Sequence, residues 1–374
     1  MTDLHNLKYH IPSFSECCDL VDKYDCFIRN DDVLTLPGGN TVTLASFTYK
    51  LGNYATFMHS GALNMRGTTY HVETEEIVAL PFWKFFNHGE NPFTDPKLIE
   101  TWDIAAVREK VDGSMINFFE IENKIFAKTK GTCKSPQSIM AEGLMQLDEN
   151  VMASVKLMIR RGQTPIYEYT SPDNQIVIPY PTSKLVYLGC RNMDNGKYIA
   201  PSDSDSLHVK DMFGVLSRSD MTVDEILSHC KTSDLVEEGY VVEFTNGELV
   251  KYKTQRYVNL HHTIDTITNR QSLAKLILSE QIDDLFPLLP VEYHQNIKEF
   301  QAIIIQKYNH LLKVANWYYE QNKQLSQKEY AINASKQFRG NKRKFSLCMA
   351  LYNQSFNEPK FKESLVTSRF WEES

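Results

Sequence analysis

The C-terminal third of this 374-residue chain is almost free of glycine, and this limits what it can fold into. Beyond Arg256 the only glycine is Gly340, and Ile297, Phe300, Ile304, Leu311 and Ala315 recur at helical spacing. Glycine weakens helix interiors, and this spacing places apolar side chains on one helix face. We therefore expect a small all-helical domain over residues 256–374.

Residues from about 40 to 260 have the sequence pattern of a strand-rich domain. Short β-branched and aromatic runs cover residues 115–121, 175–179, 184–188 and 239–244, and each is bounded by turn residues. Asn246-Gly247 lies between two such runs and is typical of a hairpin. Residues 140–161 have helical spacing and predict one helix crossing the sheet. The predicted fold class is α+β, with an antiparallel sheet followed by the helical domain.

Lys110 stands in the run Lys110-Val111-Asp112-Gly113, between two predicted strands. The run also suits an ordinary hairpin entry, because Asp-Gly is a common turn pair. A lysine here can instead be a nucleophile toward the α-phosphate of a nucleotide, provided that the site favours its neutral amine. That chemistry needs cations for the phosphates and carboxylates for a metal.

The chain supplies both kinds of group at separate positions. Lys128 and Lys130 are predicted on one face of a strand, and so are Lys251 and Lys253. Glu168 lies between two tyrosines at the expected head of a strand, and Glu238 precedes Gly239 at a strand start. Each element alone would suit a solvated strand face, but their joint occurrence favours a catalytic site.

Composition excludes several other classes of protein. The formal net charge of −7 argues against indiscriminate polyanion binding, although a local basic groove is compatible with it. The seven cysteines show no zinc-like spacing, and an odd number does not suit a full disulfide framework. No apolar run reaches membrane-spanning length, and the N-terminus is polar, so a cytoplasmic protein without a membrane partner is expected.

The order Lys-x-Asp-Gly, Tyr-Glu-Tyr, Glu-Gly-Tyr-Val-Val and Lys-Tyr-Lys resembles the motifs of the covalent nucleotidyltransferases. The chain is most similar to the RNA ligase 1 family of T-even-type bacteriophages, from about Tyr49 to beyond Asp284. The resemblance implies an adenylyltransferase domain over residues 1–255. It departs from the family at Glu109, which precedes the nucleophile, and at Tyr252, which separates the two lysines.

The resemblance also implies the roles of individual residues. Lys110, Glu168 and Tyr257 would be catalytic. Glu168, Glu238 and Asp283 would bind metal. The residues that it assigns to ATP are Tyr49, Arg66, Lys84, Phe86, Gly113, Lys130, Glu168, Glu238, Gly239, Lys251 and Lys253.

The implied activity is ATP-dependent ligation of RNA through a lysyl-AMP intermediate, with Mg²⁺ or Mn²⁺. The implied substrates are 5′-phosphate and 3′-hydroxyl RNA ends, with a nicked tRNA anticodon loop as the candidate in tRNA repair. An end-healing kinase or phosphatase is the candidate partner. The implied location is the cytoplasm, that of the host cell if the protein is phage-encoded.

Three alternatives remain open from the sequence. A DNA ligase or a capping-type guanylyltransferase would share the motifs, but these enzymes usually continue into a small β-barrel, which the helical C-terminal sequence does not favour. A catalytically silent RNA-binding protein is the third. A basic cluster at Lys336, Arg339, Lys342, Arg343 and Lys344 suits either phosphate contacts or a solvated helix end.

Overall fold

The computed structural model describes residues 4–50, 52–201, 221–282, 286, 289 and 291–372. Its contacts divide the chain into two units, Met1–Val258 and Asn259–Ser374. The division lies three residues beyond the expected boundary at residue 255. No helix in the described ranges is long and apolar enough to cross a membrane.

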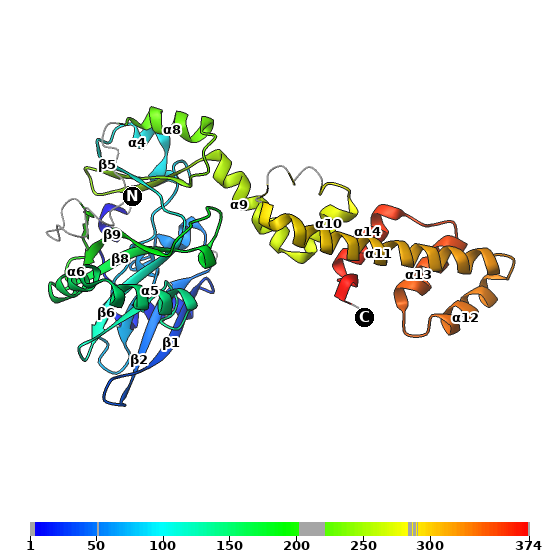
Figure 1. Cartoon of the computed structure of the whole chain (residues 1–374), viewed down its shortest axis with the longest axis horizontal. Helices are drawn as coiled ribbons and strands as arrows, with labels where there is room; N and C mark the ends of the chain where they lie inside the picture. The colour runs from blue at the N-terminus through cyan, green and yellow to red at the C-terminus, as the bar shows by residue number, and fades with distance from the viewer. Residues whose placement is uncertain are drawn as a thin grey trace. The chain divides into compact units, whose positions relative to one another are not determined.

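Antiparallel sheets form the framework of the first unit (Figure 1). One sheet has the order β1-β2-β3-β4, made of β1 (Phe27–Thr35), β2 (Thr41–Tyr49), β3 (Thr68–His71) and β4 (Ile77–Ala79). A second has the order β10-β9-β8-β6-β7, made of β10 (Tyr198–Ile199), β9 (Lys184–Asn192), β8 (Gln163–Thr170), β6 (Ser114–Ile121) and β7 (Lys124–Lys128). A third has the order β12-β11-β5, made of β12 (Leu249–Lys253), β11 (Gly239–Phe244) and β5 (Ile104–Glu109). All named strand pairs are antiparallel.

Helices cover the outer faces of two of these sheets. The helices α5 (Pro136–Leu147) and α6 (Glu149–Arg160) pack on one face of the five-stranded sheet, through a core that includes Phe118 and Val155 (Figure 1). The helices α4 (Pro96–Ile99) and α8 (Val223–Thr232) pack on the three-stranded sheet, through Ile99 and Ile226. Ahead of α9, the other α-helices among the described residues of this unit are α1 (Leu4–Leu7), α2 (Phe14–Lys23) and α3 (Tyr54–Phe57).

The second unit is helical in its described residues. The helix α9 (Gln255–Thr268) begins in the first unit, and α10 (Arg270–Leu278), α11 (Val291–Asn322), α12 (Gln327–Gln337), α13 (Lys342–Tyr352) and α14 (Glu358–Thr367) follow. Ile297, Phe300 and Ile304 are buried along α11 as the spacing predicted. The α+β fold with antiparallel sheets and a helical C-terminal region is therefore confirmed.

Two local predictions were wrong for identifiable reasons. The helix expected over residues 140–161 is two helices, because Asp148 accepts hydrogen bonds from the backbone of Asn150 and Val151 and so begins a second helix. Residues 175–179 form no strand, because the backbone N–H groups of Val177 and Ile178 donate to a side-chain carboxylate instead. The hairpin at Asn246-Gly247 is confirmed, with Gly247 at a φ of 77°.

Candidate active site

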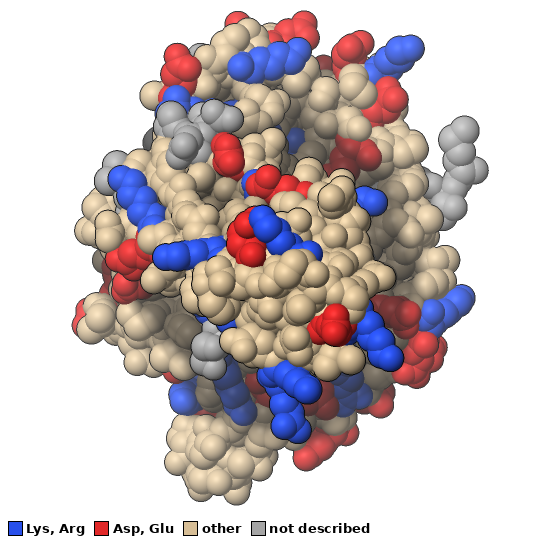
Figure 2. Space-filling view, turned by 90° about the vertical axis from the view of Figure 1, so that its right-hand side faces the viewer, with Lys and Arg blue, Asp and Glu red and all other residues tan. Residues whose placement is uncertain are grey.

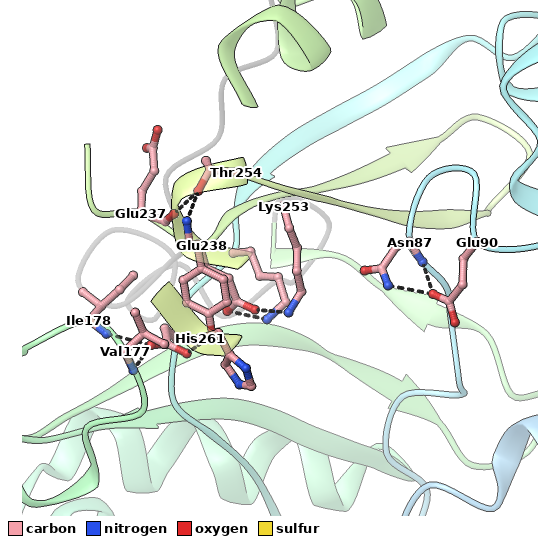
Figure 3. Close-up of polar contacts among 12 residues, drawn as sticks. Asn87, Glu90, Val177, Ile178, Glu237, Glu238, Lys253, Thr254 and His261 are labelled. Carbon is pink, nitrogen blue, oxygen red and sulfur yellow. Dashed lines mark hydrogen bonds and ion pairs between the residues drawn. The ribbon is translucent and has the colours of Figure 1, made fainter. Parts of the chain in front are cut away.

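Lys110 lies in the connection between β5 and β6, which joins the three-stranded sheet to the five-stranded sheet. Asp112 holds this connection in place and is only 2% exposed. Its Oδ2 accepts from the N–H groups of Val177 and Ile178, both at 2.9 Å, and its Oδ1 accepts from the Tyr257 hydroxyl at 2.7 Å (Figure 3). A buried carboxylate with three donors needs no further partner, so Asp112 is a structural anchor for Lys110.

Two positions close to Lys110, Gly113 and Gly239, have no room for a side chain. A Cβ at Gly113 would lie 2.4 Å from the carbonyl oxygen of Tyr169, and a Cβ at Gly239 would lie 2.0 Å from that of Tyr252. Gly239 also has a φ of 130°, which L side chains rarely adopt. Its carbonyl accepts from the backbone N–H of Lys110 at 2.8 Å. Gly113 therefore allows the Lys110 connection to approach β8 closely, and Gly239 allows β11, which bonds to Lys110, to approach β12 closely.

Glu238 stands between two of the predicted lysines. Its Oε2 is 2.6 Å from Lys110 Nζ, and its Oε1 is 3.0 Å from Lys253 Nζ (Figure 3). Glu238 is 3% exposed, whereas the Lys110 side chain is 22% exposed. A buried carboxylate is tolerated here because each oxygen faces an ammonium group. The pair leaves Lys110 accessible while fixing the position of its amine.

A cleft of about 850 Å³ opens beside these groups, and we call it the lysine cleft. Its charged lining residues are Arg66, Arg108, Glu109, Lys110, Glu168, Lys251 and Lys253. The remainder is largely apolar and includes Phe82, Phe85, Met115, Leu188, Tyr198, Val241 and Leu249. A cleft lined by both cations and apolar side chains suits a ligand with a phosphate group and a flat ring system.

Burial and unbalanced charge shift two pKa values in the lysine cleft. Burial raises the pKa of Glu168 to about 7, with Glu238 and Asp112 adding to the effect of burial and Lys110 and Arg66 opposing it. Burial lowers the pKa of Lys251 well below its usual value, and the charges of Arg66, Lys84 and Lys110 lower it further. Several cationic side chains in one cleft favour the binding of an anion.

A second group of predicted residues lies outside the lining of this cleft. Lys130 Nζ donates to the carbonyl of Tyr49 at 3.2 Å and lies 4.5 Å from its ring centroid. Lys84 Nζ lies 4.8 Å from the centroid of the Phe86 ring and 3.8 Å from Glu90. The charges of Arg66 and Lys84 add to burial in lowering the pKa of Lys130. Arg66 and Lys84 therefore both lie close enough to Lys130 to influence its charge, but Lys84 and Lys130 do not line the lysine cleft themselves.

Phe86 and Lys128 do not occupy the expected positions. The Phe86 ring packs in the core against Tyr54 and Phe57, and its neighbour Phe85 lines the lysine cleft instead. β7 ends at Lys128, so Lys130 follows the strand, and Lys128 is fully buried with its Nζ donating to Gly67. Glu168 lies near the end of β8, not at its head.

Three further predictions concern Asp283, a metal centre and the basic cluster. Asp283, predicted to bind metal, lies outside the described residues. Within those residues, no group of three or more histidine, cysteine or acidic side chains is placed to hold a metal ion. In the basic cluster, Lys342 is the first residue of α13. The side chain of Arg343 donates to the carbonyl oxygen of Ser368 at 2.8 Å. Acidic and basic side chains are interspersed on the face shown in Figure 2.

Sequence reasoning missed most of the apolar lining. Leu188 is the clearest case, because β9 contains an extra residue at this position: Ile166 of β8 pairs with Gly189, and Tyr167 pairs with Tyr187. A bulge of this kind changes the face on which a side chain lies, so simple alternation cannot place it. The repeated aromatic residues at 82–86 indicate an aromatic lining, but their spacing does not show which ring faces the cleft.

Comparison with known proteins gives matches over both units. A family model described as RNA ligase matches residues 64–258, and one described as the C-terminal domain of T4 RNA ligase 1 matches residues 264–369. A protein of Thermovibrio ammonificans, named as an RNA ligase, is 26% identical over 83% of this chain and 83% of its own.

Two further similarities are more distant or partial. A protein of Autographa californica nuclear polyhedrosis virus, named as a bifunctional polynucleotide kinase and RNA ligase, is 27% identical over 64% of this chain but only 37% of its own length. A solved archaeal ATP-dependent RNA ligase is 13% identical, with a TM-score of 0.48, over 84% of this chain and 82% of that chain.

Proposed function

Because the chain belongs to the T4 RNA ligase 1 family, we propose that it seals RNA by transferring AMP from ATP to Lys110 and then to an RNA 5′-phosphate. The observation that carries the proposal is the position of Lys110 Nζ, which lines the lysine cleft 2.6 Å from the buried Glu238. An accessible amine beside several cations is the arrangement that a lysine nucleophile toward a phosphate requires.

The first step forms a bond between Lys110 Nζ and the α-phosphorus of ATP. Lys110 must first lose a proton, and Glu238 Oε2 is close enough to accept it. The nitrogen lone pair then attacks, the bond from the α-phosphorus to the bridging oxygen breaks, and pyrophosphate leaves with that electron pair. Arg66, Lys251 and Lys253 offset the charge of the phosphates, and the apolar wall holds the base.

The later steps use the same cleft. An oxygen of the RNA 5′-phosphate attacks the phosphorus of lysyl-AMP, the phosphorus–nitrogen bond breaks, and Lys110 recovers a proton as it leaves. A 3′-hydroxyl then attacks the activated 5′-phosphate and loses its proton to solvent, the bond from that phosphorus to the AMP oxygen breaks, and AMP departs with the electron pair. Arg66 and Lys253, which line the cleft, are placed to hold the AMP phosphate during this exchange.

We propose Mg²⁺ or Mn²⁺ as the metal, with Glu168 as its protein ligand and Glu238 and Asp283 as candidates. Both oxygens of Glu238 face ammonium groups, so Glu168 is the freer carboxylate of the lysine cleft. Such a donor set suits a cation that takes most of its ligands from phosphate oxygens and water, as Mg²⁺ does. When bound, the metal would neutralise phosphate charge during transfer.

The proposed biological setting is cytoplasmic RNA repair, including tRNA repair. The relative named as a bifunctional kinase and ligase supports this setting, because a kinase can supply the 5′-phosphate that a ligase requires. A nicked tRNA anticodon loop is the proposed substrate, and an end-healing kinase or phosphatase is the proposed partner.

The test is covalent labelling of the protein with ATP carrying a radioactive α-phosphate, followed by a chase onto 5′-phosphorylated RNA. We expect the unaltered protein to be labelled and to pass the label to RNA. Lys110→Ala should abolish labelling while its circular dichroism spectrum stays unchanged. Retained labelling of a folded Lys110→Ala protein would refute the assignment. GTP in place of ATP tests the choice of nucleotide.

A further inference from the structure

Arg191 on β9 is fully buried, and every donor of its guanidinium group is used. Nε and Nη2 both donate to the carbonyl of Gly196, at 3.0 and 2.7 Å, and Nη2 also donates to that of Lys8 at 3.3 Å. Nη1 donates to the side-chain oxygen of Asn64 at 2.6 Å and to the carbonyl of Pro81 at 2.7 Å. One side chain therefore ties β9 to several other segments of the first unit.

The acceptors around Arg191 are all neutral oxygens. Within the described residues no carboxylate pairs with the guanidinium, which instead lies 5.0 Å from the centroid of the Trp83 ring. Burying a charge without a counterion costs free energy, so hydrogen bonds must replace those to water. A guanidinium presents its N–H donors as a rigid planar fork, and lysine cannot reproduce that geometry. The group is therefore suited to holding separate segments at fixed positions.

Three residues that line the lysine cleft lie next to these bonded positions, and we call them the Tyr198 patch: Phe82, Leu188 and Tyr198. Phe82 directly follows Pro81, and Tyr198 lies two residues after Gly196. Leu188 is on β9, three residues before the arginine. The arginine itself is not a lining residue, so any effect that it has on a ligand passes through the residues that it holds.

The members of the Tyr198 patch also contact one another. The ring centroids of Phe82 and Tyr198 are 5.3 Å apart, and the Tyr198 hydroxyl donates to the carbonyl of Leu188 at 2.6 Å. Tyr198 pairs with Arg191 across β9 and β10, and β10 is only two residues long. So short a strand has few ladder bonds of its own, and the bonds from the guanidinium to Gly196 hold the turn before it. The position of the patch therefore depends on the arginine.

The cationic lining of the lysine cleft depends less on Arg191. The nearest of these cations in the chain is Arg66, which lies two residues after Asn64. The side-chain amide of Asn64 donates to the carbonyls of Lys8 at 3.2 Å and of His10 at 2.7 Å, and neither bond involves the arginine. Replacing the arginine should therefore move the apolar patch more than it moves the cations.

We propose that Arg191 is a positioning residue for the nucleotide base, which it places by holding the Tyr198 patch in the wall of the lysine cleft. The inference rests on the proposed function, because it takes ATP as the ligand of that cleft. Aromatic and aliphatic side chains contact the faces of a flat ring, whereas phosphates are bound by cations. Base contacts that are equal before and during transfer change the ATP concentration required, not the maximal rate.

The test compares ATP with ribose 5-triphosphate, which has the same sugar and phosphates but no base. We measure the labelling rate of the full-length protein at increasing ATP, and then the competitive inhibition of that labelling by ribose 5-triphosphate. Arg191→Lys keeps the charge but loses the planar fork. It should raise the ATP concentration for half-maximal labelling by about tenfold to a hundredfold, as expected when a binding surface is misplaced by about 1 Å. The maximal rate and the inhibition constant for ribose 5-triphosphate should stay unchanged.

Two further variants accompany this one. Arg160→Lys makes the same replacement at an exposed arginine at the end of α6, outside the lining of the lysine cleft, and it should match the unaltered protein in every measurement. Tyr198→Phe removes the bond to Leu188 without altering the buried guanidinium. It should raise the ATP concentration for half-maximal labelling by about threefold and leave the inhibition by ribose 5-triphosphate unchanged. Circular dichroism and thermal unfolding establish that each protein is folded at the assay temperature.

The other outcomes would overturn the inference. An equal weakening of ATP and ribose 5-triphosphate would show that Arg191 acts on the phosphates through its charge or on the whole unit. A lower maximal rate at an unchanged ATP dependence would assign it to the reacting groups, and no change at all would remove it from base binding. An Arg191→Lys protein that is unfolded at the assay temperature would assign the guanidinium to the stability of the fold instead, and an unaffected Tyr198→Phe protein would separate the patch from the base. All of these results leave Lys110 as the nucleophile, whereas an unaltered protein that fails to label with ATP would refute the proposed function itself.

Discussion

The hydroxyl of Tyr257 donates a hydrogen bond of 2.7 Å to Asp112, which links the first turn of α9 to the connection that carries Lys110. Both residues are 2% exposed. The start of the helix that leaves the first unit therefore helps to fix the connection that carries Lys110.

Tyr257→Phe should lower the free energy of unfolding by about 1–3 kcal/mol, because a buried carboxylate loses one of its donors. We also expect slower labelling by ATP, since Asp112 then holds the loop less firmly. Urea unfolding and the labelling rate measure the two effects. Tyr54→Phe is the matched control, because the Tyr54 ring packs against Phe86 without a hydrogen bond from its hydroxyl among those that the described residues form. Equal stability of both variants would contradict the anchoring role.

Glu168→Gln should stabilise the protein in a pH-dependent way, measured in a chelating buffer without ATP. The pKa of Glu168 is about 7 in the folded protein against an ordinary value of 4.5, so folding favours the protonated carboxyl. The unaltered protein therefore loses stability as the pH rises from about 4.5 to 7, by up to about 3 kcal/mol.

The glutamine variant carries no such charge. Its advantage in free energy of unfolding should be absent at low pH and complete above pH 7. Urea denaturation at several pH values measures this difference. An advantage that does not change with pH would contradict the environment assigned to Glu168. The same variant should label poorly with ATP, since it lacks the proposed metal ligand.

Lys251→Met should raise the free energy of unfolding and lower the rate of labelling by ATP. Burial and neighbouring cations lower the pKa of Lys251, so the folded protein disfavours its charged form and loses stability as the pH falls below the ordinary lysine value. Removing that charge should raise the free energy of unfolding at neutral pH by about 1 kcal/mol. Labelling by ATP should fall by about a hundredfold, as expected for a lost phosphate contact. Lys97→Met, at an exposed site, should change neither quantity; a destabilised Lys251→Met protein would contradict the argument.

Gly239→Ala should fail to fold stably, because its Cβ would lie 2.0 Å from the Tyr252 carbonyl at a φ of 130°. The expected loss exceeds about 2 kcal/mol. Gly143→Ala is the matched control in α5, where nothing lies within 4 Å of the added carbon, and it should stabilise by about 0.5–1 kcal/mol. Thermal unfolding compares the two. A stable Gly239→Ala protein would show that β11 and β12 can separate at this point.

Local patterns in the sequence predicted the elements whose hydrogen bonds are local. Asn246-Gly247 predicted its hairpin, and the alternation around Tyr252 correctly placed Lys251 and Lys253 on one face. The strand predicted over residues 175–179 does not form, because the backbone there bonds to Asp112, which is far away in the chain. Alternation did not place Leu188 in the cleft, because a bulge in β9 interrupts it. Sequence periodicity records neither event, since both depend on tertiary neighbours.

The shared carboxylate of Glu238 implies an order of events in the lysine cleft. Before reaction, each of its oxygens is occupied by an ammonium group, Lys110 on one side and Lys253 on the other. A phosphoramidate nitrogen carries no positive charge, so adenylylation would remove one of these two counterions. Glu238 would then have a vacant oxygen for a ribose hydroxyl or a cation. A ligand that contacts Glu238 would therefore bind this carboxylate only after Lys110 has been adenylylated.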